Sequence, residues 1–437
     1  MRLPKHFNEL SPFGGLAVLF VLGLLARLAV TIFIADNRTL YFEHMLIAQN
    51  LLTGHGYSWD EWGRAVLQPT SLVLPFYVYW CAFFQWLSPL NFLPMYAAQA
   101  LVAASGIFPA FRVGQKWHSD RVGWLFAGLY AFYPETVFMH SKAVAESILL
   151  VAVLWMLDKY LTLRREPPGT RRAYILAVQV GLIAAIGIYF KETAAIVAAA
   201  ICISLVMQKR PLRVVSRSYL LPIILTCGLA LAPWLIRNTV VQQTIVPLRT
   251  AYGINFWISN VPESVGNDRT PDGRNVLEVL TPEYNAQMKQ VLPFDEQDRE
   301  WAYLGEAWRL IKENPAGYVT HCAHRLLYWV WFVPAHALAG NPLYRAAWIT
   351  VLLLGSTGLF VLWRERRLDA VIPLTLIGFI LLYVPVIVLP RYRAVTALLL
   401  LFGVAVTLDR LWTRSQHRRS IRLAAPLSST KCEDASL

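Results

Sequence analysis

Residues 41–58 read YFEHMLIAQNLLTGHGYS and follow closely on the first long apolar segment of the chain. Apolar side chains recur there at helical spacing, at Phe42, Met45, Leu46, Ala48 and Leu52. This pattern predicts an amphipathic helix that lies on a bilayer surface and is ended by Gly54. Glu43 is then a carboxylate at the depth of the lipid headgroups. An ordinary solvated surface charge is the alternative interpretation of this residue.

The composition of the whole chain places this helix in a membrane protein. The chain has 437 residues, of which 56% are hydrophobic and only 15% charged, and it contains 16 Trp and 19 Tyr. These proportions, with a mean hydropathy of +0.45, are typical of a polytopic membrane protein. The apolar run from Phe13 to Ala35 is long enough to span a bilayer, so we interpret it as a retained first helix and not as a cleaved signal.

The net charge of +13 has a topological explanation. Basic residues gather in short runs between apolar spans: Arg112 to Arg121, Arg164 to Arg172, Lys209 to Arg217, Arg364 to Arg367, and Arg414 to Arg422. Such runs mark the cytoplasmic side, and they predict no nucleic-acid partner. The five cysteines show neither a CxxC pair nor a metal-type spacing, so no disulfide frame and no metal site is predicted.

The apolar segments predict an all-α fold with about 10 transmembrane helices. These are residues 13–35, 92–111, 122–140, 143–163, 172–190, 192–208, 218–236, 343–363, 369–389 and 394–413. Segments 70–87 and 317–334 are ambiguous, and the count rises to as many as 12 if either crosses. We interpret the first as a juxtamembrane or re-entrant segment and the second as an amphipathic helix on the outer surface. We expect both termini in the cytoplasm and two outer loops, residues 36–91 and 237–342. The predicted units are a module 1–236, the loop 237–342, C-terminal helices 343–413, and a basic tail 414–437.

Several motifs along the chain resemble one family. They are "E-x-x-x-I-A-x-N-L-L-x-G-x-G-Y-S" from Glu43 to Ser58, QPTSLVLPFYVY at 68–79, APWLIRN at 232–238, YGINFWISN at 252–260 and PRYR at 390–393. In this order they resemble the GT-C polyprenyl-phosphate-sugar glycosyltransferases, a superfamily that includes protein O-mannosyltransferases and lipid A aminoarabinose transferases. The resemblance implies the GT-C fold and transfer of a sugar from a polyprenyl-phosphate donor to an extracytoplasmic lipid, glycan or protein, with inversion.

This chemistry needs a base for the acceptor hydroxyl and cations for the departing phosphate. The resemblance implies Glu43 as the base, with Asp36 as a weaker candidate, because relatives carry acidic residues where this chain has Leu40 and Tyr41. The expected phosphate ligands are Arg237, Arg391, Arg393 and Lys191. A donor without a nucleotide makes no metal or other cofactor obligatory, and no D-x-D motif occurs in either outer loop.

Expected substrate and sugar contacts are His44, His55, Tyr57, Tyr252, Asn255, Trp257 and Asn260. Four alternatives stay open at this point. Aromatic residues here also suit an interfacial belt, and histidines here are often simply solvated. Lys191 either binds phosphate or pairs with Glu146. The protein as a whole is either the enzyme or a non-catalytic transporter, flippase or scaffold for polyprenyl-linked intermediates; the lack of an internal repeat argues against transport. The expected location is a bacterial inner membrane, with the site facing outward.

Overall fold

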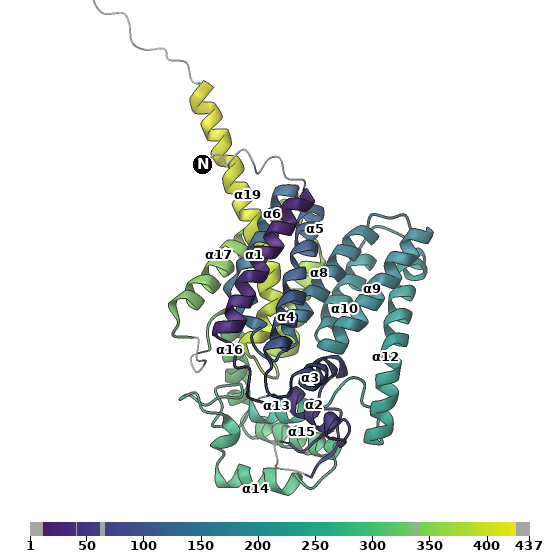
Figure 1. Ribbon diagram of the computed structural model, residues 1–437, viewed down its shortest axis with the longest axis vertical. Helices are drawn as coiled ribbons and strands as arrows, with labels where there is room; N and C mark the ends of the chain where they lie inside the picture. The colour runs from purple at the N-terminus through teal and green to yellow at the C-terminus, as the bar shows by residue number, and fades with distance from the viewer. Residues whose placement is uncertain (1–11, 41, 62–65, 334–335, 337–338, 425–437) are drawn as a thin grey trace, which may run out of the picture.

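Helices make up most of the computed structural model, which describes residues 12–40, 42–61, 66–333, 336 and 339–424. They form an upper bundle of long helices and a lower layer of shorter ones (Figure 1). The described strands are β1 (Ser58–Trp59) and β2 (Gln68–Pro69), which pair antiparallel with Ser58 opposite Pro69. The all-α prediction is therefore confirmed.

The bundle is built from helices that correspond to the predicted spans. They are α1 (Pro12–Phe33), α4 (Leu93–Ser105), α5 (Ile107–Trp117), α6 (Asp120–Phe132), α7 (Pro134–Met139), α8 (Glu146–Leu163), α9 (Arg171–Phe190), α10 (Ala194–Val206), α12 (Leu221–Gln242), α17 (Pro342–Arg364), α18 (Val371–Tyr383) and α19 (Ala394–Ala424). The short segments α11 (Leu212–Val215) and η2 (Ser216–Leu220) lead into α12, and η4 (Pro390–Arg393) leads into α19.

Six helical segments of the described chain are long and apolar enough to cross a membrane. They are Phe13–Phe33, Leu93–Trp117, Arg171–Phe190, Leu212–Gln242, Pro342–Arg364 and Pro390–Arg418. The other predicted spans are helical but shorter or more charged: α10 and α18 have 13 residues each, and α8 carries Glu146, Asp158 and Lys159. The span predicted at 122–140 is broken, because Pro134 starts a new helix after α6. The protein is thus a multi-pass membrane protein, while a count of ten crossings stays a prediction.

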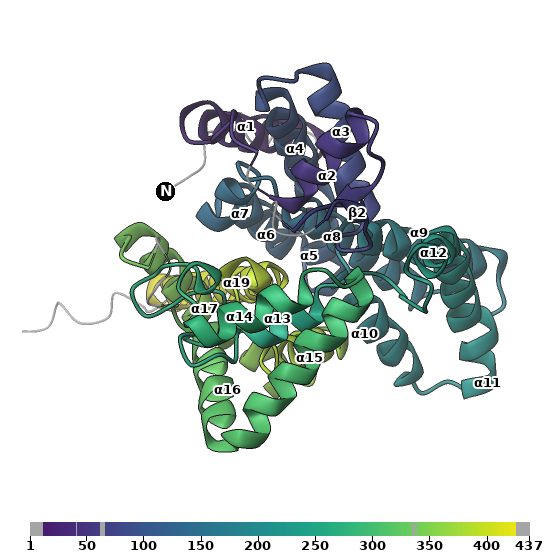
Figure 2. The ribbon, with the colours of Figure 1, turned by 90° about the horizontal axis from the view of Figure 1, so that it is seen from below.

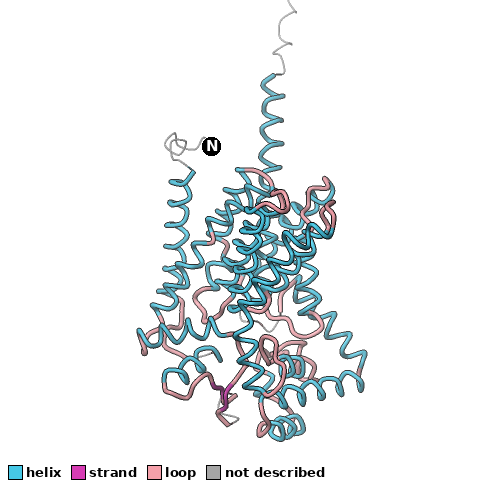
Figure 3. Tube along the Cα trace, turned by 90° about the vertical axis from the view of Figure 1, so that its right-hand side faces the viewer, coloured by secondary structure: helices cyan, strands magenta, loops and turns pink. Residues whose placement is uncertain are grey.

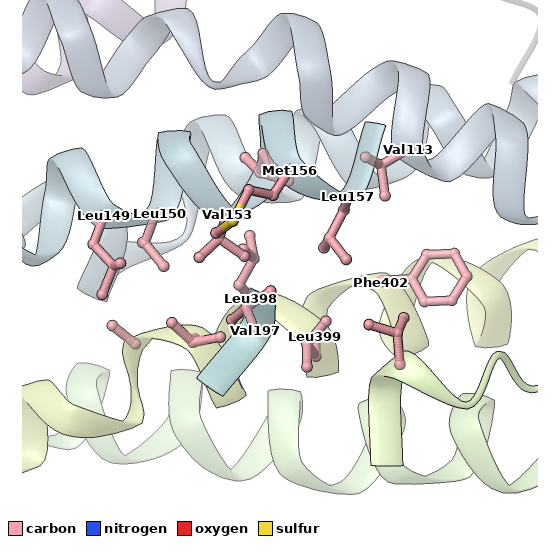
Figure 4. Close-up of a cluster of buried hydrophobic side chains, with 14 of the residues drawn as sticks. Val113, Leu149, Leu150, Val153, Met156, Leu157, Val197, Leu398, Leu399 and Phe402 are labelled. Carbon is pink, nitrogen blue, oxygen red and sulfur yellow. The ribbon is translucent and has the colours of Figure 1, made fainter. Parts of the chain in front are cut away.

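Close helix packing holds the centre of the bundle together. Aliphatic and aromatic side chains of α5, α8, α10 and α19 interdigitate there, among them Val113, Met156 and Phe402 (Figure 4). At the contact of α17 and α19, Gly358 faces Gly403, and a Cβ added to either glycine would overlap the backbone of the other helix. Small residues at such contacts let membrane helices approach closely.

The lower layer contains both predicted outer loops. Its helices are α2 (Glu43–Leu52), α3 (Pro75–Leu87), α13 (Tyr252–Ile258), η3 (Val276–Glu278), α14 (Pro282–Val291), α15 (Glu296–Glu313) and α16 (Pro315–Val330). The start of α1 and the end of α19 lie at the opposite end of the molecule (Figures 1 and 3). Both ambiguous segments, now seen as α3 and α16, belong to or border this layer. Seen from below, α2 and α3 lie beside α4, while α13 and α15 cover the side of α17 and α19 (Figure 2).

Helix α2 matches the predicted amphipathic helix closely. It buries Met45, Ile47 and Ala48 and is capped at its C-terminus by Thr53. Gly54 follows with φ at 86°, a left-handed conformation that suits glycine just after a helix. The start of α2, and with it Glu43, is thereby held against the bundle.

Candidate functional site

Glu43 is the first residue of α2, and its half-buried side chain lies at the helix N-terminus. Burial by itself would raise the pKa of this carboxyl group. His44, Arg391 and Arg249 nearby, together with the backbone N–H of Glu43, outweigh burial and lower the pKa below the usual value of a glutamate. The positive end of the helix dipole acts in the same direction. Glu43 is therefore an ionised carboxylate at neutral pH.

Segments far apart in the sequence bring further charges to this place. The set is called the charged cluster, and its members are Glu43, Glu146, Lys191, Glu192, Arg249 and Arg391. Lys191 Nζ lies 3.8 Å from Glu146 and 3.9 Å from Glu192. Arg391 Nε lies 3.5 Å from Glu146, and an Arg249 terminal nitrogen lies 3.6 Å from Glu192. Of the two roles open for Lys191, the structure shows the pair with Glu146.

Glu43 differs from the other two acids of the charged cluster. Glu146 and Glu192 each face two cations within 4.0 Å, whereas Glu43 makes no ion pair with any described residue. The terminal nitrogens of Arg391 likewise donate no hydrogen bond to the described part of the chain, and the side chain is 36% exposed. The cluster thus offers one unpaired carboxylate and one arginine with unused donors.

Two cavities lie next to each other at the start of α2. The larger, of about 700 Å³, is lined by Phe42, Lys142 and Arg391 among others. The smaller, of about 110 Å³, is lined by Glu43, Arg249 and Glu300 among others. Consecutive residues, Phe42 and Glu43, therefore face different cavities. This arrangement suits two substrates that approach one carboxylate from different sides.

The backbone around Lys142 is held by hydrogen bonds from the side chain of Gln99 in α4. The buried Gln99 amide donates to the carbonyl oxygens of His140 and Lys142, at 3.0 Å each, and Tyr77 donates to Gln99 at 2.8 Å. The Lys142 side chain itself is exposed to the larger cavity. Lys142 and Arg391 are thus two cations of that cavity, whose lining also contains Arg269 and three acidic residues, Glu135, Asp268 and Asp272.

Two carboxylates beside the smaller cavity join the outer loops: Glu61 of the first loop lies 3.2 Å from Arg299 of the second, and Glu296 of the second binds the first. Glu296, at the start of α15, accepts hydrogen bonds from the Ser71 backbone N–H at 2.8 Å and from the Thr250 hydroxyl at 2.7 Å. The Thr70 hydroxyl donates to its other oxygen. Burial raises the pKa of the neighbouring Glu300 to about 7, although Gly253 N–H donates to it at 2.6 Å. Glu296 therefore ties the first loop to the second.

Two of the predicted phosphate ligands are engaged with protein oxygens. Arg237 donates to the Thr70 carbonyl oxygen at 2.5 Å and lies over the rings of Tyr57 and Trp234. Arg393 is fully buried, donates to the Trp331 carbonyl oxygen at 2.6 Å, and lies over the Trp348 ring at 4.2 Å. The geometry gives both arginines a role in packing, and phosphate binding by either stays a prediction.

The predicted substrate contacts fall into two groups. Tyr252 and Asn255 belong to α13; Arg249 lies 6.0 Å from the Tyr252 ring, and Asn255 lines the smaller cavity. His44 packs edge-on against Tyr77, and burial lowers its pKa to about 4, so it is neutral at physiological pH. His44 follows Glu43 in α2 and Asn255 shares the smaller cavity with it, while Tyr252 lies beside Arg249 of the charged cluster.

The remaining four predicted contacts lie away from Glu43 or have their polar atoms in use. Trp257 is 1% exposed and stacks on Tyr303 in the core of the lower layer. Asn260 accepts a hydrogen bond from Arg325 at 2.8 Å. Tyr57 donates to the Val73 carbonyl oxygen, and the exposed His55 bonds to Thr53. A sugar contact at any of them stays a prediction.

Sequence reasoning missed Arg249, Lys142 and Glu296. Arg249 stands alone in a polar stretch after α12, and Lys142 falls between two predicted spans, where it looks like an ordinary boundary charge. The signal that separates Lys142 from the basic runs is its position on the predicted outer side. The described residues contain no group of three His, Cys, Asp or Glu side chains placed to hold a metal ion. The predicted independence from metals and cofactors stays a prediction.

Comparison with known proteins gives a likeness in structure only. No family model and no curated protein matches the chain in sequence. The archaeal oligosaccharyltransferase AglB from Archaeoglobus fulgidus, solved with an inhibitory peptide and a dolichol-phosphate, is similar with a TM-score of 0.52 at 14% identity, over 97% of this chain and 53% of that one. The same enzyme tethered to an acceptor peptide gives a TM-score of 0.53 at 11% identity, over 95% and 52%.

ArnT from Cupriavidus metallidurans in the apo state is similar over 97% of this chain and 67% of that one, with a TM-score of 0.45 at 15% identity. The chain spans about half the length of the archaeal oligosaccharyltransferases. These identities show the fold and nothing finer. The chain has the GT-C fold of a multi-pass membrane protein.

Proposed function

We propose that the protein is a membrane glycosyltransferase that moves a sugar from a polyprenyl-phosphate carrier to an extracytoplasmic acceptor. The observation that carries the proposal is the Glu43 carboxylate, which makes no ion pair with a described residue and lines the smaller cavity, next to the larger cavity that Lys142 and Arg391 line. The dolichol-phosphate present in one AglB structure supports a lipid-phosphate donor. We further propose a bacterial inner membrane with the site facing outward.

On the donor side, the phosphate lies in the larger cavity against Lys142 and the terminal nitrogens of Arg391. Arginine and lysine hold phosphate oxygens through charge-assisted hydrogen bonds. Arg391 Nε lies 3.5 Å from Glu146, and the terminal nitrogens of Arg391 donate no hydrogen bond to a described residue. The guanidinium thus stays anchored while its other nitrogens bind the phosphate.

On the acceptor side, a hydroxyl group enters next to Glu43. Glu43 takes the hydroxyl proton while the oxygen attacks the anomeric carbon from the face opposite the phosphate. The bond between the anomeric carbon and the phosphate oxygen breaks, its electron pair leaves with the phosphate, and Lys142 and Arg391 stabilise the added charge. One displacement of this kind inverts the anomeric configuration, and it needs neither a metal nor another cofactor.

Glu43→Gln tests the proposal, because the amide keeps the shape of the side chain but cannot accept the proton. We expect sugar transfer to fall by a factor of about 10² to 10⁴, the usual contribution of a general base. Binding of the sugar-free polyprenyl phosphate should change little. Glu278→Gln is the matched control, since Glu278 is exposed in the same layer and outside both cavities.

The assay uses purified protein in nanodiscs with a panel of polyprenyl-phosphate sugars, and mass spectrometry follows loss of the sugar from the carrier. Undiminished transfer by Glu43→Gln would overturn the assignment of the base. Carrier binding without turnover by the unmodified protein, with cell-envelope acceptors present, would instead favour a transporter, flippase or scaffold.

A further inference from the structure

A small hairpin of the second loop forms one wall of the larger cavity. It runs from residue 264 to residue 276 and is called the 264–276 hairpin. Its backbone ladder includes Val265 N–H to the Arg269 carbonyl oxygen and Val276 N–H to the Asp268 carbonyl oxygen, both 3.0 Å. Asn267, Asp268 and Arg269, in the first half of the hairpin, line the cavity with Lys142 and Arg391. The hairpin therefore faces the compartment in which the donor is proposed to bind.

The hairpin is fixed in place by Arg325 of α16. This fully buried arginine donates to the Gly266 carbonyl oxygen at 2.8 Å, the Ser259 carbonyl oxygen at 2.6 Å and the Pro385 carbonyl oxygen at 3.0 Å. Gly266 has φ at 98°, a conformation that other residues rarely adopt. A rigid backbone of this kind holds its side chains in one orientation.

Asn267 has an unused hydrogen-bond donor, and the neighbouring Asp268 has a side-chain oxygen that accepts no hydrogen bond from a described residue and lies 3.7 Å from Arg269 Nε. Its side-chain oxygen accepts from the Arg269 backbone N–H at 2.8 Å, which fixes the orientation of the amide. The amide nitrogen makes no hydrogen bond to any described residue, although Asn267 is only 1% exposed. Burying such a donor without a partner costs about 1–3 kcal/mol. A ligand oxygen in the cavity would remove that cost.

We propose that Asn267 reads the transferred sugar by donating a hydrogen bond from its amide nitrogen to a sugar oxygen. The inference rests on the proposed function and adds the class of sugar. The NH₂ group is a donor only, so it suits a hydroxyl or carbonyl oxygen and repels an ammonium group at the same position. The transferred sugar is then a hexose or pentose with an oxygen substituent at the position that faces Asn267. An amino sugar with its ammonium group at that position is excluded.

The test compares two variants with one control in the same hairpin. Asn267→Asp keeps the side-chain oxygen that accepts from Arg269 N–H and replaces the NH₂ group with a second oxygen. Asn267→Ala removes the whole amide group. Asn275→Asp is the control, because the Asn275 side chain only accepts from Leu277 N–H at 3.0 Å and lies outside the cavity.

We expect Asn267→Ala to lower transfer from a polyprenyl-phosphate hexose by about 3- to 10-fold, the worth of one hydrogen bond. Asn267→Asp should lower it further and shift the ratio of rates toward a polyprenyl-phosphate aminopentose. Both variants should bind sugar-free polyprenyl phosphate as the unmodified protein does. Asn275→Asp should behave like the unmodified protein in every assay.

Unchanged rates and an unchanged donor preference in both Asn267 variants would overturn the inference and leave the proposed function standing. An equal loss of affinity for sugar-free carrier would also overturn it, since the residue would then act on the phosphate or on the fold. If the unmodified protein transfers no sugar, the proposed function fails. Asn267 is then tested by binding alone, through the ratio of the affinities for sugar-bearing and sugar-free carrier. If the unmodified protein prefers the sugar-bearing carrier and Asn267→Ala removes this preference, the contact is supported. If Asn267→Ala keeps the preference, the contact is overturned.

Discussion

Arg325→Met removes the hydrogen bonds that organise the second loop while keeping most of the side-chain volume. Arg325 has four oxygen partners in the described chain: the carbonyl oxygens of Ser259, Gly266 and Pro385, and the side-chain oxygen of Asn260. A hydrogen bond from a charged donor is worth about 1.5–3 kcal/mol net. Arg325 makes no ion pair with a described acid, so its burial costs several kcal/mol of desolvation free energy, and Arg325→Met removes this cost. We therefore expect the loop to lose about 2–4 kcal/mol of local stability.

Hydrogen exchange measured by mass spectrometry reports this loss of local stability directly. A loss of about 2–4 kcal/mol raises the exchange rate of the protected amides in residues 262–276 by about 30- to 1,000-fold, provided that they exchange by local opening. Peptides from α8 and α19 in the bundle serve as the internal reference and should not change. Unchanged exchange in residues 262–276, or an equal rise in the bundle, would refute the reasoning.

Two other outcomes follow from the charged cluster. Arg391→Gln should weaken binding of polyprenyl phosphate by about 10-fold or more, because a charge-assisted hydrogen bond is lost. Arg391→Lys should recover part of the lost affinity. Equal affinity of the unmodified protein and both variants in a lipid-binding titration would contradict this prediction. The lowered pKa of Glu43 means that its base form is present above that pKa and is lost only as the pH falls through it. Half of the transfer rate should therefore be lost only at a pH below the ordinary pKa of a glutamate, about 4.3. A decline that begins above pH 6 would point to another group.

The fold was largely predictable from the sequence because hydropathy and basic runs are local properties. Every predicted span contains a helix, and α2 begins and ends where the amphipathic pattern and Gly54 indicate. The break at Pro134 is visible in the sequence, yet hydropathy over residues 122–140 hides it. The lengths of α10 and α18 depend on packing against other helices, which no local pattern contains.

The candidate site was only partly predictable, because its partners come from distant segments. Glu43 and Arg391 stand in motifs and both belong to the charged cluster. Arg249 joins them only because the chain after α12 folds back on Glu192. Trp257 and Asn260 also stand in a motif, but the lower layer uses both to build its own core. A motif shows that a residue matters and leaves open whether it serves the site or the fold.

The position of Arg391 has a consequence for how the protein is made. Arg391 lies in η4, immediately before α19, while Glu43 follows α1. Glu43 and Arg391 are therefore synthesised about 350 residues apart, and the larger cavity lacks the part of its lining that Leu389, Pro390 and Arg391 supply until η4 has been made. A nascent chain released before η4 would hold Glu43 and Lys142 without Arg391, and so would lack one of the two cations proposed to bind the phosphate.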